Sequence, residues 1–223
     1  MKNQTLTISL STEESVSAIL SRPEGQCKTG IVIAHGAAND MHNPLIKAVA
    51  EGLAKDGIAC LRFNFLYREK QKKSVDPEHR LVLAWKQAIN CMAETCKPEK
   101  IIAMGKSLGA RIAAQATAEN QVAPDRLIFL GYPLHAPGKK DRLRDAPLYK
   151  IEQPMLFFEG TRDPFCDLAL LDKVLKKVKT RTHLEIIDNG NHSFELPKSN
   201  PRPQEDIFEQ IIAYCNHWIR EDI

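Results

Sequence analysis

Short apolar runs alternate with longer amphipathic stretches over most of the chain, and this alternation predicts the elements of the fold. Near the N-terminus polar and apolar residues alternate one by one, which is typical of strands, and we expect the first two strands to form a hairpin. Strands are expected at residues 5–10, 15–22, 31–34, 58–65, 101–104, 127–130, 155–158 and 182–187. Helices are expected at residues 44–55, 77–96, 110–118, 168–178 and 204–219.

Strands that alternate with helices imply a mostly parallel sheet with helices on both faces. We therefore predict an α/β fold with a sheet of eight or nearly eight strands, in a single domain that covers residues 1–223. The segment at residues 133–153 is irregular and polar, and it is the one candidate for a lid. Because this segment is short, we expect a minimal lid or none.

Composition and charge exclude some classes of function. The 223 residues are 43% apolar and 26% charged, which is ordinary for a globular protein. The net charge of +3 is too small to indicate nucleic acid or a membrane surface as a partner. The basic segments at residues 68–73 and 139–144 are interrupted by acidic and polar residues, so we interpret them as solvated loops.

The location of the protein is predicted from its apolar runs and its cysteines. No run approaches the roughly 18 apolar residues of a membrane span, and the first ten residues lack the pattern of a signal peptide. The six cysteines are scattered without a C-x-x-C pair. Buried free thiols are typical of a reducing compartment, so we expect a cytoplasmic protein.

The most informative segment is Gly105-Lys106-Ser107-Leu108-Gly109, which lies between a predicted strand and a predicted helix. A strand, a Gly-x-Ser-x-Gly turn and a helix are the parts of a nucleophile elbow, which holds its serine in a strained turn at the start of the helix. The flanking glycines suit this turn, because strand and helix nearly touch there. The alternative is an ordinary glycine-rich turn, but the surrounding pattern favours the elbow, with Ser107 as the nucleophile.

Two further strand ends carry the groups that a serine nucleophile needs, since functional residues collect at the carboxyl ends of parallel strands. Asp163 follows the strand at residues 155–158, and His192 follows the strand at residues 182–187. A histidine can take the serine proton, and an aspartate can fix its tautomer and stabilise the imidazolium. We predict His192 as the base and Asp163 as the acid. The alternatives are a turn-capping Asp163 with Asp167 as the acid, and a loop histidine without a role.

A reacting carbonyl also needs two N–H donors for its developing oxyanion. We expect one donor at Leu108, directly after the nucleophile, and the other at Ala37, in the loop after the strand at residues 31–34. Gly36 would let this loop turn inward without a Cβ clash. His35 is interpreted as a structural residue that orients the loop.

Lys106 and Arg111 flank the elbow and are possible contacts of a substrate or supports of a loop. Arg111 lies one helical turn after Ser107, so it could face the sheet or a substrate carboxylate; structural pairing with a carboxylate is the alternative that we favour. The histidines show no metal-binding spacing such as H-E-x-x-H, so we predict neither a metal nor another cofactor.

Four segments of the chain resemble a small α/β-hydrolase family. This family is related to dienelactone hydrolases and to the hydrolase-like domain of the third subunit of the non-specific-lethal chromatin complex and its testis-expressed relative. The resemblance implies the α/β-hydrolase fold and a triad at Ser107, Asp163 and His192. The chain departs from the family pattern in having alanines after His35-Gly36 and Ala110 after the elbow. The resembling segments are residues 35–41, 105–111, 160–165 and 191–194.

The leading hypothesis is a serine hydrolase that cleaves a small ester or thioester through an acyl-enzyme. A second hypothesis is a binding or scaffold protein on the same fold with an idle triad. A third is acyl transfer or peptide cleavage by the same residues, since pocket shape selects the leaving group. Without a long insertion the site should be open and shallow, which suits small or flexible acyl groups. The expected partner is a small molecule, and the oligomeric state is left open.

Overall fold

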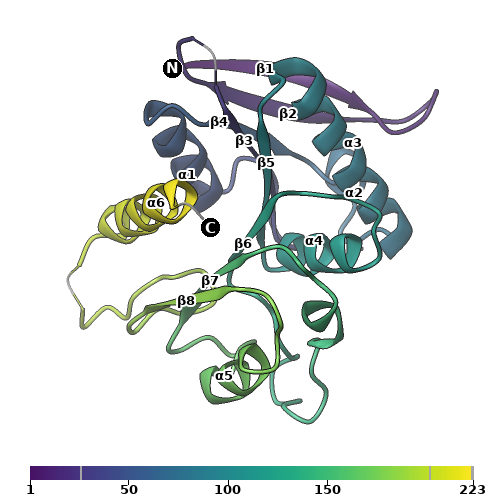
Figure 1. Cartoon of the computed structure of the whole chain (residues 1–223). Helices are drawn as coiled ribbons and strands as arrows, with labels where there is room; N and C mark the ends of the chain where they lie inside the picture. Colours follow the sequence, from purple (N-terminus) through teal and green to yellow (C-terminus); the bar gives the residue numbers. More distant parts are fainter. Residues whose placement is uncertain (26, 201, 222–223) are drawn as a thin grey trace.

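Eight strands form one sheet in the computed structural model, which describes residues 1–25, 27–200 and 202–221 (Figure 1). The order in the sheet is β1-β2-β4-β3-β5-β6-β7-β8. The pairs β1–β2 and β2–β4 are antiparallel, and the remaining pairs are parallel. The predicted hairpin and the mostly parallel eight-stranded sheet are therefore confirmed. The strands are β1 (Lys2–Ser9), β2 (Ser15–Arg22), β3 (Thr29–Ala34), β4 (Ala59–Phe63), β5 (Lys100–Lys106), β6 (Arg126–Leu130), β7 (Met155–Gly160) and β8 (Thr182–Ile187).

Helices cover both faces of this sheet. Figure 1 shows α1 and α6 side by side on one face, while α3 and α4 pack together on the other. The short helices α2 and α5 follow the carboxyl ends of β4 and β7. The helices are α1 (Pro44–Lys55), α2 (Leu66–Glu69), α3 (Glu78–Cys96), α4 (Leu108–Ala118), the 3-10 turn η1 (Ala146–Tyr149), α5 (Leu168–Leu175) and α6 (Gln204–Arg220).

Side chains of the central strands alternate between two hydrophobic cores. In β3, Ile31 and Ile33 join the core beneath α1 and α6, whereas Val32 and Ala34 join the core beneath α3 and α4. Strands β5, β6 and β7 alternate in the same way. Burial on both faces explains why these strands are continuous apolar runs in the sequence. Their parallel pairing brings the ends of β3, β5, β7 and β8 to one edge of the sheet.

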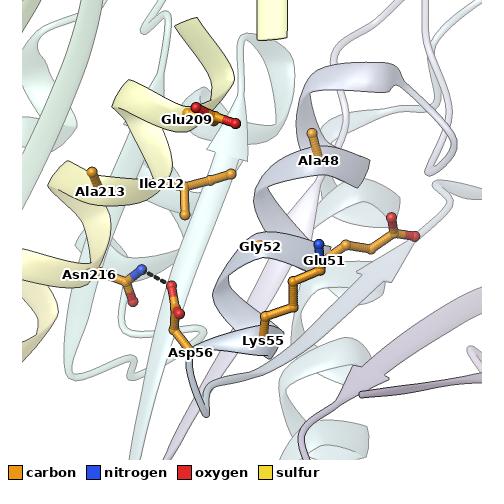
Figure 2. Close-up of a pocket in the computed structure, with 9 residues that line it drawn as sticks. All are labelled: Ala48, Glu51, Gly52, Lys55, Asp56, Glu209, Ile212, Ala213 and Asn216. Atoms are coloured by element: carbon orange, nitrogen blue, oxygen red, sulfur yellow. Dashed lines mark hydrogen bonds between the residues drawn. The ribbon is translucent and has the colours of Figure 1, made fainter. Parts of the chain in front are cut away.

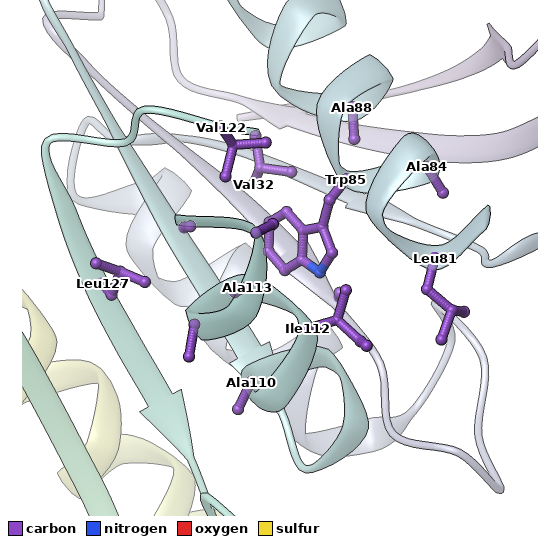
Figure 3. Close-up of a cluster of buried hydrophobic side chains, with 14 of the residues drawn as sticks. Val32, Leu81, Ala84, Trp85, Ala88, Ala110, Ile112, Ala113, Val122 and Leu127 are labelled. Carbon is purple, nitrogen blue, oxygen red and sulfur yellow. The ribbon is translucent and has the colours of Figure 1, made fainter. Parts of the chain in front are cut away.

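The core beneath α3 and α4 gathers around Trp85 of α3 (Figure 3). The indole is fully buried and points toward Ile112 and Ala113 of α4. It also meets the Phe63 ring of β4 edge to face, at 5.4 Å between centroids. The small side chains of α4 let it lie close to both α3 and the sheet. This packing fixes the helix that begins directly after Ser107.

Several predicted bounds need correction. The strand expected at residues 58–65 covers only Ala59–Phe63, and the helix expected at residues 168–178 ends at Leu175. The helix expected at residues 110–118 begins earlier, at Leu108. Periodicity misses the two shortest elements, α2 and η1, because four residues complete little more than one turn.

The segment at residues 133–153 is not a free lid. It contains η1 and buries Leu134 and Leu148 in the core. The Tyr132 hydroxyl, just before it, donates to the Arg144 carbonyl at 2.7 Å. We therefore describe it as a packed connection. Among the residues that the structure describes, no helix is both long and apolar enough to cross a membrane.

Candidate active site

Ser107 occupies a turn that depends on its glycine neighbours. Its φ of 52° and ψ of −109° lie outside the regions that residues with a side chain usually adopt. A Cβ atom at Gly105 would lie 2.3 Å from the Ala110 nitrogen, and one at Gly109 would lie 2.6 Å from the Ala34 carbonyl oxygen. Because both obstacles are backbone atoms, a side chain at Gly105 would push β5 away from α4, and one at Gly109 would push α4 away from β3. The local geometry is that of the predicted elbow.

A second close approach joins the loops after β7 and β8. A Cβ atom at Gly160 would lie 2.2 Å from the Gly190 carbonyl oxygen, which accepts the Arg162 N–H at 2.9 Å. The Asn189 N–H donates to the Thr161 hydroxyl at 2.7 Å. These contacts bring two loops together that lie far apart in the sequence, and each loop carries one predicted site residue.

The structure joins Ser107, His192 and Asp163 through a chain of hydrogen bonds. His192 Nε2 lies 2.8 Å from Ser107 Oγ, and His192 Nδ1 lies 2.6 Å from Asp163 Oδ2. A carboxylate only accepts, so the Nδ1 atom carries the imidazole proton and Nε2 is left to accept the serine proton. The three residues predicted from separate strand ends therefore meet in a single arrangement.

Asp167, the alternative acid, lies in a different environment. Its carboxylate caps α5 by accepting the Leu170 N–H at 3.0 Å and pairs with Lys140 at 2.6 Å. The side-chain hydrogen bond to Lys140 lowers the pKa of Asp167. Asp167 is therefore the capping residue of this loop, and Asp163 is the carboxylate beside His192.

Burial increases from the serine inward. The His192 side chain is 20% exposed, whereas the Asp163 side chain is 0% exposed. The Phe165 ring covers the imidazole at 4.4 Å between centroids, and the Phe165 N–H donates to Asp163 Oδ1 at 2.7 Å. On the other side, Asn191 Oδ1 accepts the Ser193 N–H at 2.8 Å and shapes the turn around His192. The imidazole is thus held between a buried carboxylate and the accessible serine.

The two predicted oxyanion donors flank Ser107 and have no acceptor. Among the described residues, neither the Leu108 N–H nor the Ala37 N–H donates a hydrogen bond to a protein group. Leu108 begins α4, where free N–H groups and the helix dipole favour negative charge. The role expected for Gly36 needs correction, since a Cβ atom there would make an ordinary contact, 3.4 Å from the Ser107 Cβ. That contact nevertheless places the Ala37 loop directly against the nucleophile.

His35 supports the loop from inside the protein. It is fully buried, and its Nε2 atom accepts the Phe65 N–H at 3.1 Å. Nδ1 therefore carries the proton and donates to the Gly36 carbonyl at 2.8 Å. Burial lowers the pKa of His35 to about 4, so the imidazole stays neutral near pH 7. This geometry is that of the loop-orienting residue expected from the sequence.

Lys106 and Arg111 both contact protein groups. Lys106 is buried, and its ammonium donates to the His192 carbonyl and lies 5.5 Å from the centre of the Phe194 ring. Burial lowers the pKa of Lys106 to about 8, against the opposing effect of nearby carboxylates. Arg111 pairs with Glu78 of α3 at 2.9 Å. The sequence left two roles open for Lys106 and Arg111, contact with a substrate or support of a loop. Their contacts are with neighbouring protein elements, which fits the supporting role.

The sequence interpretation missed a buried carboxyl group next to the site. Glu159 is fully buried at the end of β7, and its Oε1 accepts the Tyr132 N–H at 2.5 Å. Burial and the neighbouring charge of Asp163 raise the pKa of Glu159. The buried Cys166 thiol lies against the same carboxyl group, and burial raises the pKa of that thiol as well. The sequence signal that could have revealed this group is Glu159 itself, a charged residue at the end of an apolar strand.

Neither of two sizeable pockets is lined by Ser107. A groove of about 600 Å³ separates α1 from α6, and Figure 2 shows charged side chains along it, with Asn216 bonded to Asp56. A cavity of about 370 Å³ lies behind the acid, where Asp163, His135 and Lys140 contribute to its lining. Within the described ranges, no group of three or more His, Cys, Asp or Glu side chains is arranged to hold a metal ion.

Comparisons with known proteins place this geometry in context. The profile of a family described as an alpha/beta hydrolase domain matches residues 27–220. Among solved structures, a dienelactone hydrolase from Anabaena variabilis is 21% identical, with a TM-score of 0.77 and 97% of each chain covered. A serine hydrolase without a lid from Xanthomonas campestris is 18% identical, with a TM-score of 0.75, and the match covers 100% of this chain and 97% of that one. A serine hydrolase homologue from Coxiella burnetii is 18% identical, with a TM-score of 0.76 and coverage of 96% and 98%.

The strained turn predicts an unusual order of stability between two variants. Ser107→Ala and Ser107→Gly both delete the hydroxyl, but only glycine adopts the backbone angles of position 107 without strain. We expect the glycine variant to have the larger free energy of unfolding, by about 1 kcal/mol. Urea denaturation measures the difference. The same pair at exposed Ser193, where φ is not positive, is the control and should favour alanine or be neutral. Equal stability of the two variants at position 107 would contradict a strained elbow.

Proposed function

Because the chain belongs to the alpha/beta hydrolase domain family, whose fold it has, we propose that it is a serine hydrolase that cleaves a small ester or thioester through an acyl-enzyme. One observation carries the proposal. The Ser107 hydroxyl, the His192 imidazole and the Asp163 carboxylate form a continuous chain with distances of 2.8 Å and 2.6 Å. This is the arrangement that activates a serine, which is otherwise a poor nucleophile.

In the proposed acylation step, Ser107 Oγ attacks the carbonyl carbon of the substrate while His192 Nε2 takes the hydroxyl proton. Asp163 accepts a hydrogen bond from Nδ1–H and stabilises the imidazolium, and its carboxylate stays unprotonated. The carbonyl oxygen gains negative charge, and the N–H groups of Leu108 and Ala37 would donate hydrogen bonds to this oxyanion. When the tetrahedral intermediate collapses, His192 donates its proton to the leaving alkoxide or thiolate, and the acyl group stays on Ser107.

Deacylation repeats these steps with water as the nucleophile. His192 Nε2 takes a proton from the attacking water, and the second tetrahedral intermediate uses the same N–H donors. Its collapse releases the acid, and His192 returns the proton to Ser107 Oγ. The partial exposure of the His192 side chain supports this step, because water has to reach the imidazole.

The hydrogen-bonded chain favours catalysis over the alternative of an idle scaffold. An unused histidine on an exposed loop would have no reason to meet both a serine and a buried carboxylate. Acyl transfer and peptide cleavage would use the same residues, and the leaving group alone separates them from hydrolysis. The relationship to the non-specific-lethal complex subunit stays a prediction from the motifs. The free thiols support the proposed cytoplasmic location.

Replacing the nucleophile should abolish turnover while the fold survives. We expect Ser107→Ala to lower the rate on p-nitrophenyl acetate by about 10⁴-fold or more, because loss of one triad member disables the whole unit. Steady-state kinetics measure the effect. Ser193→Ala is the matched control, since it removes an exposed hydroxyl beside His192 and should leave the rate unchanged. Wild-type rates in Ser107→Ala would contradict the assignment of the nucleophile.

The packed segment at residues 133–153 predicts the size of the acyl group. With Leu148 of η1 buried in the core and the Arg144 carbonyl bonded to the Tyr132 hydroxyl, we expect the site to bind short acyl chains and to offer little apolar surface to long ones. We expect kcat/KM on p-nitrophenyl esters to be highest for acyl chains of roughly two to six carbons and to fall for longer chains. An additional CH₂ group strengthens binding only where a pocket buries it. Highest activity at ten carbons or more would contradict an open, shallow site.

A further inference from the structure

A short segment after β4, residues 64–67, is one of the supports on the inner side of the loop that carries Ala37. The Asn64 carboxamide oxygen accepts the Met41 N–H at 2.8 Å, at the far end of the loop. At the near end, the Tyr67 hydroxyl donates to the Ala37 carbonyl at 2.8 Å and lies 3.4 Å from the Gly36 carbonyl. In the described part of the chain, the phenol is the one donor to the Ala37 carbonyl.

The direction of these carbonyls determines the direction of the N–H groups. In a trans peptide the C=O and N–H bonds point in opposite directions. The Gly36 carbonyl points inward to His35, so the Ala37 N–H of the same peptide points outward. The Ala37 carbonyl points inward to Tyr67, so the Ala38 N–H also points outward. Ala37 and Ala38 are exposed, and Gly36 lies against Ser107, so the loop that presents these two N–H groups borders the nucleophile.

Tyr67 is itself fixed in place before any substrate binds. Its backbone N–H donates to Asp76 Oδ2 at 2.7 Å, its ring is fully buried, and it meets the His35 ring edge to face at 5.9 Å. Its own short helix, α2, is tied to β2 because the Glu69 carboxylate accepts the Ser17 N–H at 2.9 Å. Burial raises the pKa of Tyr67 to about 12, so the phenol keeps the proton that it donates.

We propose that Tyr67 is a positioning residue of the oxyanion hole, because its hydroxyl holds the Ala37 carbonyl inward and so keeps the backbone N–H groups of this loop aimed at the substrate oxygen. This inference rests on the proposed function. It differs from a general structural role, since the phenol is hydrogen-bonded to neither Ser107 nor His192 and acts through carbonyls of the Ala37 loop, above all that of Ala37. Its effect should therefore appear in the transition state, where the oxyanion forms, and leave substrate binding unchanged.

Tyr67→Phe deletes the hydroxyl and keeps the ring. We expect kcat on p-nitrophenyl acetate to fall by roughly tenfold or more, with KM within about twofold. Removing an oxyanion donor typically lowers kcat by about 10²- to 10³-fold, and a donor that is only misaligned should cost somewhat less. Inhibition by a small trifluoromethyl ketone, whose adduct with Ser107 carries an oxyanion, should weaken by a similar factor. A merely structural role would not couple these two quantities.

Tyr132→Phe is the matched control. Its hydroxyl is equally buried and also donates to one backbone carbonyl, that of Arg144, at 2.7 Å. Both variants are assayed below their melting temperatures, and only Tyr67→Phe should lose kcat and ketone affinity. Unchanged kcat in Tyr67→Phe, or equal losses in both variants, would overturn the inference. Wild-type protein without Ser107-dependent turnover would instead contradict the proposed function, and the inference with it.

Discussion

Helix α4 approaches β5 and β3 so closely around Ser107 that the α4 backbone leaves no room for a side chain at Gly105, and the Ala34 backbone leaves none at Gly109. This approach forces Ser107 into an unfavourable conformation, and the surrounding structure has to hold it there. On one side β5 is paired with β3 and β6, and on the other α4 is packed against Trp85. The position of the hydroxyl is therefore set by the core of the protein, and every other group of the site is arranged around it.

The remaining groups reach the serine from loops that are anchored on their inner sides. The loops of Asp163 and His192 meet where Gly160 touches the Gly190 carbonyl, and the buried Lys106 ammonium holds the His192 carbonyl. The Ala37 loop is held by His35 and Tyr67 in the same way. The His192 and Ala37 loops thus turn carbonyls inward and leave an imidazole or an N–H near the serine, while the Asp163 carboxylate stays buried behind the imidazole. Preorganisation of this kind is what transition-state stabilisation requires.

The sequence predicted the parts of this arrangement that depend on local pattern. The fold and the elbow were accessible because strands, glycines and helix follow one another directly around Ser107. Asp163 and Asp167 could not be separated with certainty, since they lie four residues apart in one loop and only the three-dimensional structure shows which one meets His192. Tyr67 and Glu159 were missed because their contacts arise from the pairing of strands distant in the sequence.

The central claim is that the hydrogen-bonded chain makes Ser107 an activated nucleophile, and covalent labelling tests it without knowledge of the substrate. Wild-type protein and Ser107→Ala would be treated with a small fluorophosphonate and their intact masses measured. The account predicts one adduct on the wild-type protein and none on the variant. No adduct on the wild-type protein, or the same adduct on both, would contradict it.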